Sequence, residues 1–344
     1  MMQTTPDSDS LPVGVLYTGG TFGMVPSDRG YTPSSDLPER AQAALAGSNH
    51  PPLRWLDPGT GPAINSADVT PAFWHALAET IRRNAVHCAG FVVIHGTDTL
   101  AFTGSALSFL LADVGRPVVV TGARAPLGEA TSDARENLLT ALHAAATSGF
   151  AGTGLAFGGE LLQANRSSKR FGAPGQPFTS PNADPLATFD GNTLHWQRTL
   201  DTLEASLPVV TDSASRAAML AVYPGISGDV IRGLVDTGVA ALLLETYPSG
   251  IGPGEDAGFV AAIDAASRHG VVVAAVSQNQ YGGVRLGHYA TSTPLAEAGL
   301  VAGADMTREA AFTKLHYLIN CGIDRGTIID AFQRNLCGEL TATA

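Results

Sequence analysis

The sequence predicts an α/β protein with two domains, each built around a sheet of parallel strands. Short apolar runs alternate with amphipathic helical segments along most of the 344 residues. The run at 90–94 is uninterrupted, which is typical of a parallel strand buried on both faces. Between 201 and 215 this pattern gives way to Asp, Thr, Ser and Pro. We therefore expect a larger N-terminal domain (1–200) with a mostly parallel sheet, a linker (201–215) and a smaller C-terminal domain (216–344) with a parallel sheet.

The N-terminal domain begins with a strand predicted at 13–17, which ends in a glycine-rich turn. Segment 25–38 is predicted to be a loop that acts as a lid, and 51–62 is predicted to be irregular. Thr70 and Pro71 begin a helix with an apolar face. After the strand at 90–94 we expect a helix (100–114), a strand (118–121), a helix (132–146) and a strand (154–157). The polar segment 161–178 is predicted to be a hairpin or loop.

The C-terminal domain repeats the alternation of strand and helix. Strands are predicted at 219–222, 241–244 and 271–276, with helices at 229–234 and 255–268 between them. Two helices, 307–318 and 325–333, end the chain. This order predicts a second parallel sheet.

Composition excludes several classes of partner. The formal net charge of -11 argues against nucleic acid and against an anionic membrane, because both require clustered Lys and Arg. The first ten residues carry acids where a signal peptide carries basic residues, and no apolar run is long enough to span a bilayer. The three cysteines are widely spaced and are predicted to be reduced. We expect a cytoplasmic protein that binds a small molecule.

Hydroxyl and charged residues follow two strands that can be neighbours. Thr21 follows the first strand, and Thr97 and Asp98 follow the central one. Ligands of open α/β sheets bind at the carboxyl ends of strands. A hydroxyl becomes a good nucleophile only when a group accepts its proton, and both Tyr31 and Lys169 are candidates for that role. Lys169 could also neutralise Asp98.

Each feature taken alone has a simpler interpretation. The Gly-Gly-Thr sequence at 19–21 is more often a plain turn, and it lacks the spacing of a phosphate-binding loop. Lys169 would by default be a solvated charge, and His95 a packed residue of the core. The sequence has neither an HExxH zinc motif nor a GxSxG elbow.

Taken together, the motifs indicate a protein family. Residues 17–21 (YTGGT) and 95–99 (HGTDT) resemble the two signature motifs of bacterial L-asparaginases. The runs 91–109, 122–139, 165–169, 223–227 and 303–317 are similar to the cytoplasmic type I branch of that family. The resemblance covers the chain from 13 to about 340.

The resemblance implies hydrolysis of L-asparagine to L-aspartate and ammonia with no metal and no organic cofactor. By position, Thr21 matches the first catalytic threonine and Tyr31 the loop tyrosine that helps to deprotonate it. Thr97, Asp98 and Lys169 match the Thr-Asp-Lys triad of the family. Ser66 matches the serine that binds the α-carboxylate of the substrate, and Asp98 would also bind its α-ammonium. Gly20 and Ala123 match small residues beside the substrate. The family forms homodimers and homotetramers, so an oligomer is expected.

Two questions stay open at this level. Attack by the Thr21 hydroxyl would give a tetrahedral oxyanion, then an acyl-enzyme that water cleaves. Thr21 is favoured because it lies beside the predicted lid, and Thr97 with Lys169 is the alternative. Type I relatives use an arginine and a cysteine at an allosteric asparagine site, where this chain has Glu245 and Asn279. A reversed charge cannot bind the effector carboxylate in the same way, so we expect no such switch.

Two rival classes of function remain. One is another amidase on the same scaffold, either an enzyme with glutaminase activity or the asparaginase-like subunit of a tRNA-dependent amidotransferase. That subunit usually carries an extra amino-terminal domain, whereas only about a dozen residues precede the first strand here. The other is a non-catalytic amino-acid sensor, which could lose a threonine or Lys169. All five catalytic positions are filled, which favours catalysis.

Overall fold

The computed structural model describes residues 11–28, 30–147, 150–170, 176–200, 207–210 and 214–341. The chain divides into two compact units, Met1–Thr202 and Leu203–Ala344. Parts of the predicted linker, 201–206 and 211–213, lie outside the described residues. Each unit is an α/β layer structure, so the predicted fold class is confirmed.

Unit 1 is built on an eight-stranded sheet in the order β12-β11-β8-β7-β6-β5-β1-β4. Five strands are parallel: β4 (Leu53–Leu56), β1 (Val13–Tyr17), β5 (Phe91–Ile94), β6 (Val118–Thr121) and β7 (Thr153–Phe157). Three more extend the sheet in antiparallel pairs: β8 (Glu160–Gln163), β11 (Ala187–Phe189) and β12 (Leu194–Trp196).

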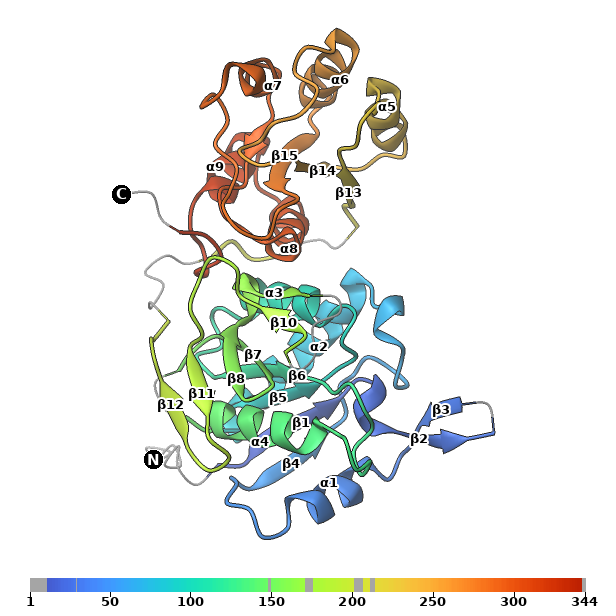
Figure 1. Ribbon diagram of the computed structural model, residues 1–344, viewed down its shortest axis with the longest axis vertical. Coiled ribbons are helices and arrows are strands. Elements are labelled where there is room, and N and C mark those ends of the chain that lie inside the picture. The colour runs from blue at the N-terminus through green and yellow to red at the C-terminus, as the bar shows by residue number, and fades with distance from the viewer. Residues whose placement is uncertain are drawn as a thin grey trace, which may run out of the picture. The chain divides into compact units, whose positions relative to one another are not determined.

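Helices cover both faces of this sheet. α1 (Leu37–Leu45) and α4 (Ala134–Ala145) pack on the face that carries Val92 and Ile94. α2 (Pro71–Asn84) and α3 (Leu100–Leu110) lie on the opposite face, as Figure 1 shows. Phe91, Val92, Val93 and Ile94 are all fully buried, because alternate side chains of β5 meet opposite helical layers. The predicted doubly covered strand is confirmed.

The sheet order of unit 1 has a topological switch point between β1 and β5. The connection that leaves β1 runs to β4 on one side, whereas the connection that leaves β5 runs to β6 on the other. Connections that diverge in this way leave a crevice at the carboxyl ends of the two strands. The two motif segments, 17–21 and 95–99, therefore meet at the edge where an open α/β sheet binds its ligand.

Several expectations for unit 1 were wrong in detail. The predicted loop at 25–38 contains the hairpin of β2 (Met24–Ser27) and β3 (Gly30–Pro33), and α1 begins at Leu37. The predicted irregular segment 51–62 contains the edge strand β4. Both were missed because these strands are short and partly or fully exposed, so they lack the continuous apolar run of a buried strand. α3 ends at Leu110 rather than 114. Short elements complete the unit: η2 (Thr21–Gly23), η3 (Ser66–Asp68), η4 (Ala85–His87), η5 (Ala164–Arg166), β9 (Ser168–Lys169) and β10 (Phe178–Thr179).

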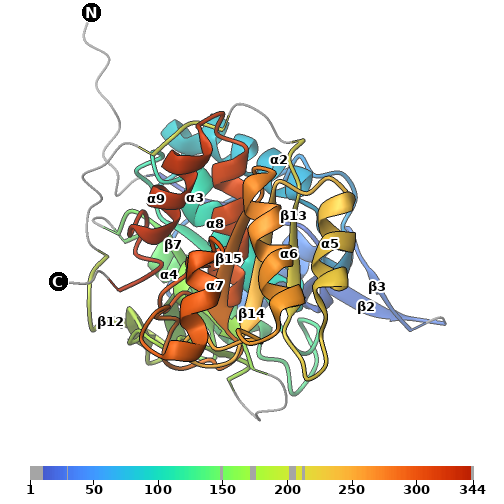
Figure 2. The ribbon, with the colours of Figure 1, turned by 90° about the horizontal axis from the view of Figure 1, so that it is seen from above.

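Unit 2 holds a four-stranded parallel sheet in sequence order: β13 (Ala217–Ala221), β14 (Ala241–Thr246), β15 (Val272–Ser277) and β16 (Val301–Ala302). Its helices are α5 (Gly228–Asp236), α6 (Ala257–Arg268), α7 (Thr293–Glu297), α8 (Arg308–Ile319) and α9 (Arg325–Gln333), with η6 (Ala290–Ser292). Figure 2 shows α5 and α6 on one face of the strands and α8 and α9 on the other. Because every connection between strands steps in the same direction, this sheet has no switch point.

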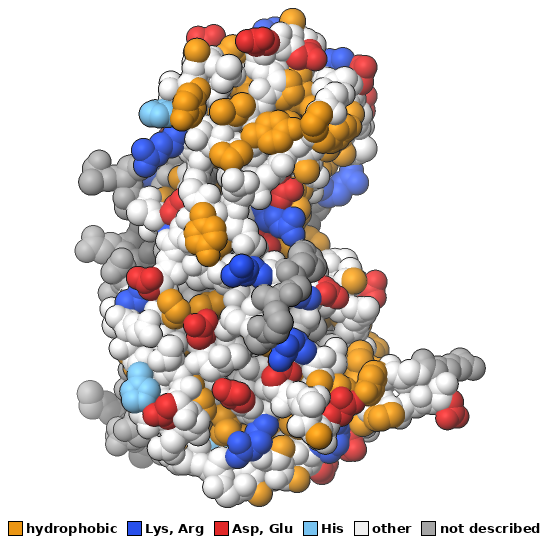
Figure 3. All heavy atoms as spheres, in the orientation of Figure 1, with side chains coloured by type: hydrophobic (Ala, Val, Ile, Leu, Met, Phe, Trp, Pro, Cys, Tyr) orange, Lys and Arg blue, Asp and Glu red, His pale blue; other side chains and the backbone are white. Residues whose placement is uncertain are grey.

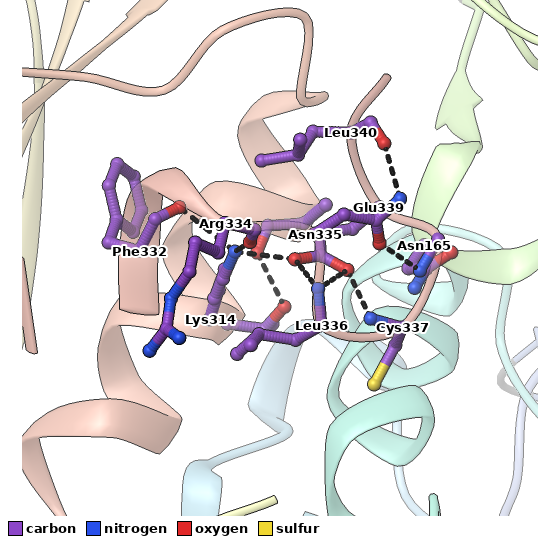
Figure 4. Close-up of polar contacts among 12 residues, drawn as sticks. Asn165, Lys314, Phe332, Arg334, Asn335, Leu336, Cys337, Glu339 and Leu340 are labelled. Carbon is purple, nitrogen blue, oxygen red and sulfur yellow. Dashed lines mark hydrogen bonds and ion pairs between the residues drawn. The ribbon is translucent and has the colours of Figure 1, made fainter. Parts of the chain in front are cut away.

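The end of unit 2 is held by a buried ion pair. Lys314 on α8 and Glu339 are both fully buried, with 2.5 Å between Nζ and Oε1. Nζ also donates to the carbonyl oxygens of Phe332 (2.9 Å) and Arg334 (2.5 Å). The carboxylate of Glu339 accepts the backbone N–H of Cys337 (2.6 Å), as Figure 4 shows. The segment after α9 is therefore tied to α8 through fully bonded charges.

The helices in the described ranges are too short or too polar to cross a membrane. On the face drawn in Figure 3, basic side chains are scattered among acidic ones rather than gathered in one patch.

Candidate active site

The glycine-rich turn after β1 brings its backbone against the end of β5. Gly19 and Gly20 adopt φ of 125° and 82°, which other residues rarely adopt. A Cβ on Gly20 would lie 2.4 Å from the Cα of Gly96, so only glycine fits there. The Tyr17 hydroxyl donates to the Gly20 carbonyl at 3.2 Å. Thr21 follows as the first residue of η2 and is half-buried.

Ser66 lies on the other side of Gly96. A Cβ on Gly96 would lie 2.6 Å from Ser66 Oγ, and Thr99 Oγ1 donates to the Ser66 carbonyl at 2.7 Å. Ser66 belongs to η3, whose N-cap, Asn65, accepts a backbone N–H of the same turn. Only 3% of Ser66 is exposed. Gly20 and Ser66, which are distant in sequence, thus converge on one backbone position.

Lys169 joins the two polar residues that follow β5. Its Nζ donates to Thr97 Oγ1 at 3.0 Å and to Asp98 Oδ1 at 2.6 Å. The Lys169 side chain is 18% exposed and that of Asp98 is 63% exposed. Lys169 comes from β9, which follows a buried polar stretch in which Ser167 Oγ donates to the Gln163 carbonyl at 2.7 Å. The structure brings together the Thr-Asp-Lys set that the sequence singled out.

The segment after β6 closes the same region. A Cβ on Gly122 would lie 2.5 Å from the His95 carbonyl oxygen and 3.4 Å from Thr97 Cγ2. The Asn137 amide holds the Gly122 carbonyl at 2.9 Å. Ala123, the next residue, is 2% exposed. Ala123 therefore adjoins a glycine whose lack of a Cβ leaves room for the His95 carbonyl.

Tyr31 occupies a different position from the other candidates. It lies on β3, is 53% exposed, and its hydroxyl donates to the carboxylate of Glu129. This hydrogen bond raises the pKa of Tyr31, because it favours the protonated phenol. In the described part of the chain, Tyr31 is bonded to Glu129 and not to Thr21.

His95 is the packed core residue that the sequence indicated. It is 1% exposed, and burial lowers its pKa to about 4, so the ring is neutral at pH 7. Gly96, Gly122 and Glu129 were not singled out from the sequence. The glycines follow apolar runs at strand ends, a signal that could have found them, whereas Glu129 lies 98 residues from Tyr31 and gives no local signal. Within the described ranges, no three His, Cys, Asp or Glu side chains are grouped to hold a metal ion.

The arrangement has the parts needed for acyl transfer. Threonine hydroxyls lie at the carboxyl ends of two strands, and a lysine ammonium is bonded to one of them. A half-exposed carboxylate can receive a cationic group of a substrate. These features fit a hydrolase that works by acyl transfer.

Comparison with known proteins gives the family. Residues 12–202 match the family model "Asparaginase, N-terminal", and residues 216–332 match the "Glutaminase/Asparaginase C-terminal domain". The chain belongs to the asparaginase family, which confirms the resemblance noted from its motifs.

Individual relatives span nearly the whole chain. L-asparaginase 1 of Escherichia coli K12 is 40% identical over 333 residues, covering 95% of this chain and 97% of that protein. The crystal structure of L-asparaginase I from Vibrio cholerae superposes with a TM-score of 0.86 at 34% identity, covering 96% and 99% of the two chains. The L-asparaginase of Thermococcus kodakarensis is 30% identical over 330 residues, covering 96% of this chain and 99% of that protein.

Proposed function

We propose that this protein is an L-asparaginase, an amidohydrolase that converts L-asparagine to L-aspartate and ammonia. The family models and the near full-length relatives support this activity. One observation ties this activity to the candidate site: the Lys169 ammonium donates to Thr97 Oγ1 at 3.0 Å and to Asp98 Oδ1 at 2.6 Å.

Substrate binding follows from the charges at this edge. Asp98 uses one oxygen for Lys169 and exposes 63% of its side chain, so its carboxylate can accept the α-ammonium of asparagine. Ser66 Oγ, packed against Gly96, donates to the α-carboxylate. Gly20 and Ala123 leave room for the side-chain amide because neither has a side chain larger than methyl.

Chemistry then proceeds by acyl transfer from nitrogen to oxygen. The Thr21 oxygen bonds to the amide carbon as its proton leaves, and backbone N–H groups at the glycine-rich turn stabilise the oxyanion. The C–N bond breaks, ammonia departs with a proton, and water cleaves the remaining ester. Tyr31 accepts the Thr21 proton while its own phenol proton passes to the carboxylate of Glu129, which already accepts its hydrogen bond. Thr97 is the alternative nucleophile, in which case Lys169 takes the Thr97 proton after one of its own ammonium protons has passed to Asp98.

Ammonia release from asparagine and from glutamine tests the activity. We expect asparagine to be the better substrate and glutamine a weak one. Thr21→Ala, Thr97→Ala and Lys169→Met should each lower kcat by about 10²-fold or more, because each removes a group used in the transition state. Thr140→Val is the matched control, since Thr140 is buried on α4 and bonds only within its own helix. Variants that fold and hydrolyse asparagine as fast as wild type would contradict the mechanism.

The nucleophile can be identified separately. Acid quenching during turnover, followed by digestion and mass spectrometry, should find the aspartyl ester on the peptide that contains Thr21. An ester on the Thr97 peptide would reverse the two threonine roles. Wild-type protein that binds asparagine without releasing ammonia would instead identify an amino-acid sensor.

We also propose that the allosteric asparagine switch of type I relatives is absent. The Glu245 side chain is 12% exposed, with Oε1 3.5 Å from Arg308 Nη1. The amide of Gln278, beside Asn279, donates to the carbonyls of Val222 (2.6 Å) and Glu245 (2.7 Å). A carboxylate effector would meet the buried carboxylate of Glu245, which repels it. The rate should depend hyperbolically on asparagine concentration in a steady-state titration, and a sigmoidal curve would refute this proposal.

A cytoplasmic homodimer or homotetramer completes the proposal. Unit 2 exposes Tyr223, Tyr281 and Tyr289, and hydrophobic side chains gather over unit 2 in Figure 3, as is typical of subunit contacts. Multi-angle light scattering measures the oligomer directly, and a monomeric mass would reject it. Cys88, Cys321 and Cys337, all within the described residues, form no disulfide, which suits a reducing compartment.

A further inference from the structure

A buried hydrogen-bonded chain leads from α2 to the backbone of the candidate site. Trp74 Nε1 donates to Thr103 Oγ1 at 3.0 Å. Thr103 Oγ1 lies 3.2 Å from His95 Nε2, and His95 Nδ1 lies 2.7 Å from the Gly96 carbonyl oxygen. These four residues come from α2, α3 and the end of β5. Trp74 is 6% exposed, Thr103 is fully buried and His95 is 1% exposed.

The donor and acceptor roles in this series of hydrogen bonds are fixed by the groups at its two ends. The indole N–H of Trp74 can only donate, and the carbonyl of Gly96 can only accept. Thr103 therefore receives the indole proton and gives its own hydroxyl proton to His95 Nε2. The proton of the neutral ring must then lie on Nδ1, where it meets the carbonyl of Gly96. A single tautomer of His95 satisfies every group.

The ring of His95 is also held in place by packing. The ring of Phe73 meets it edge to face, with 5.9 Å between centroids and 80° between planes. The backbone N–H of His95 donates to the Thr121 carbonyl at 2.8 Å, which continues the pairing of β5 with β6. Ring and backbone of His95 are therefore both constrained.

Gly96 is the residue through which this series of hydrogen bonds can affect the candidate active site. It is the backbone point against which Gly20 and Ser66 both pack, with no room for a Cβ on either Gly96 or Gly20. The planar peptide that His95 grips through its oxygen carries the Thr97 nitrogen at its other end. Rotation of this peptide would move Thr97 away from Lys169.

We infer that His95 is a positioning residue for the proposed hydrolysis. Its Nδ1–H grips the Gly96 carbonyl, and through that peptide it sets Thr97 and Asp98 against Lys169, Gly20 and Ser66. Thr103 and Trp74 serve to hold the proton of His95 on Nδ1. The inference rests on the proposed function, because the side chains that His95 positions are those assigned to substrate binding and catalysis.

Thr103→Val is the central test, since it removes the hydroxyl at nearly constant volume and lies outside the substrate pocket. Without that donor, Nε2 loses the bond that keeps it unprotonated, and the proton can move to Nε2. We expect kcat to fall about 10-fold or more, as small displacements of reacting groups commonly cause. Thr103→Ser restores the hydroxyl and should recover most of that loss. Thr140→Val, an equally buried threonine on α4, should leave kcat unchanged.

Nitrogen NMR of histidine-labelled protein gives a readout that a purely structural role would not change. In wild type, the His95 signals, assigned by their absence in His95→Gln, should show a protonated Nδ1 and an unprotonated Nε2. Thr103→Val should show both tautomers or the reverse one, and Thr103→Ser the wild-type pattern.

The positioning role of His95 and the proposed function can fail separately in these experiments. A protonated Nε2 in wild type, or full kcat in a Thr103→Val protein whose tautomer has changed, would overturn the inference. Wild-type protein with the expected tautomer and no ammonia release would overturn the proposed function, and with it the positioning role. Thermal melting of each variant separates loss of folding from loss of rate.

Discussion

At the scale of single residues, the chain uses its two lysines in opposite ways. Lys314 is fully buried, and its ammonium is bonded to one carboxylate and two carbonyl oxygens. Burial lowers its pKa, although the Glu339 carboxylate opposes that shift. Lys169 instead bonds a threonine hydroxyl and a carboxylate that is largely open to solvent. The first environment stabilises a loop, whereas the second leaves groups that a substrate can reach.

The buried His95 makes the stability of unit 1 depend on pH. Its pKa is about 4 in the folded protein against 6.5 for an exposed histidine, because burial disfavours the charged ring. Below pH 6.5 the unfolded chain binds a proton that the folded chain does not, so stability falls as the pH is lowered from 6.5 to 4. The shift corresponds to about 3 kcal/mol of unfolding free energy.

Urea unfolding at a series of pH values measures this contribution. All three tryptophans, Trp55, Trp74 and Trp196, belong to unit 1, so their fluorescence reports on that unit. His95→Gln should flatten the dependence between pH 6.5 and 4, whereas His87→Gln, at an exposed site of the same unit, should preserve it. An equal slope in wild type and His95→Gln would show that His95 does not titrate in this way.

At the scale of elements, the sequence predicted the strands that are buried on both faces, because such strands appear in the sequence as continuous apolar runs. Most residues of β5, β6, β14 and β15 are apolar because both faces of these strands are covered, and each strand lies close to where the sequence predicted it. β4, β11 and β12 have three or four residues and partly exposed side chains, so their pairing depends on partner strands rather than on local pattern.

The site was predictable in part for the same reason. Thr21, Thr97 and Asp98 directly follow strands, so sheet topology places them at one edge once those strands are recognised. Lys169 lies 71 residues from Asp98, and no spacing rule connects the two, so charge alone offered Lys169 as one candidate partner and the family resemblance was needed to place both in one triad. The bond of Tyr31 to Glu129, 98 residues away, was not predictable at all, because it depends on how a short exposed hairpin is held.

At the scale of the whole molecule, each unit has its own hydrophobic core. One core spans α1, α4 and the large sheet, and the other spans α5, α6 and the small sheet. Within the residues that the structure describes, only the eight-stranded sheet of unit 1 has a topological switch point, and the candidate site lies there. The described strands of unit 2 lie in sequence order and leave no such crevice. Strand order therefore explains why the candidate site belongs to the sheet of unit 1.

Separate cores predict that damage to one unit stays local. Lys314→Met leaves the Glu339 carboxylate buried without its cation, which should destabilise unit 2 by roughly 3–5 kcal/mol. Hydrogen exchange should accelerate in peptides from β14 and β15, while those from β5 and β6 keep wild-type rates. The double variant Lys314→Met with Glu339→Gln removes the uncompensated charge and should recover part of the loss. Equal acceleration in both units would show instead that the two cores unfold as one cooperative structure.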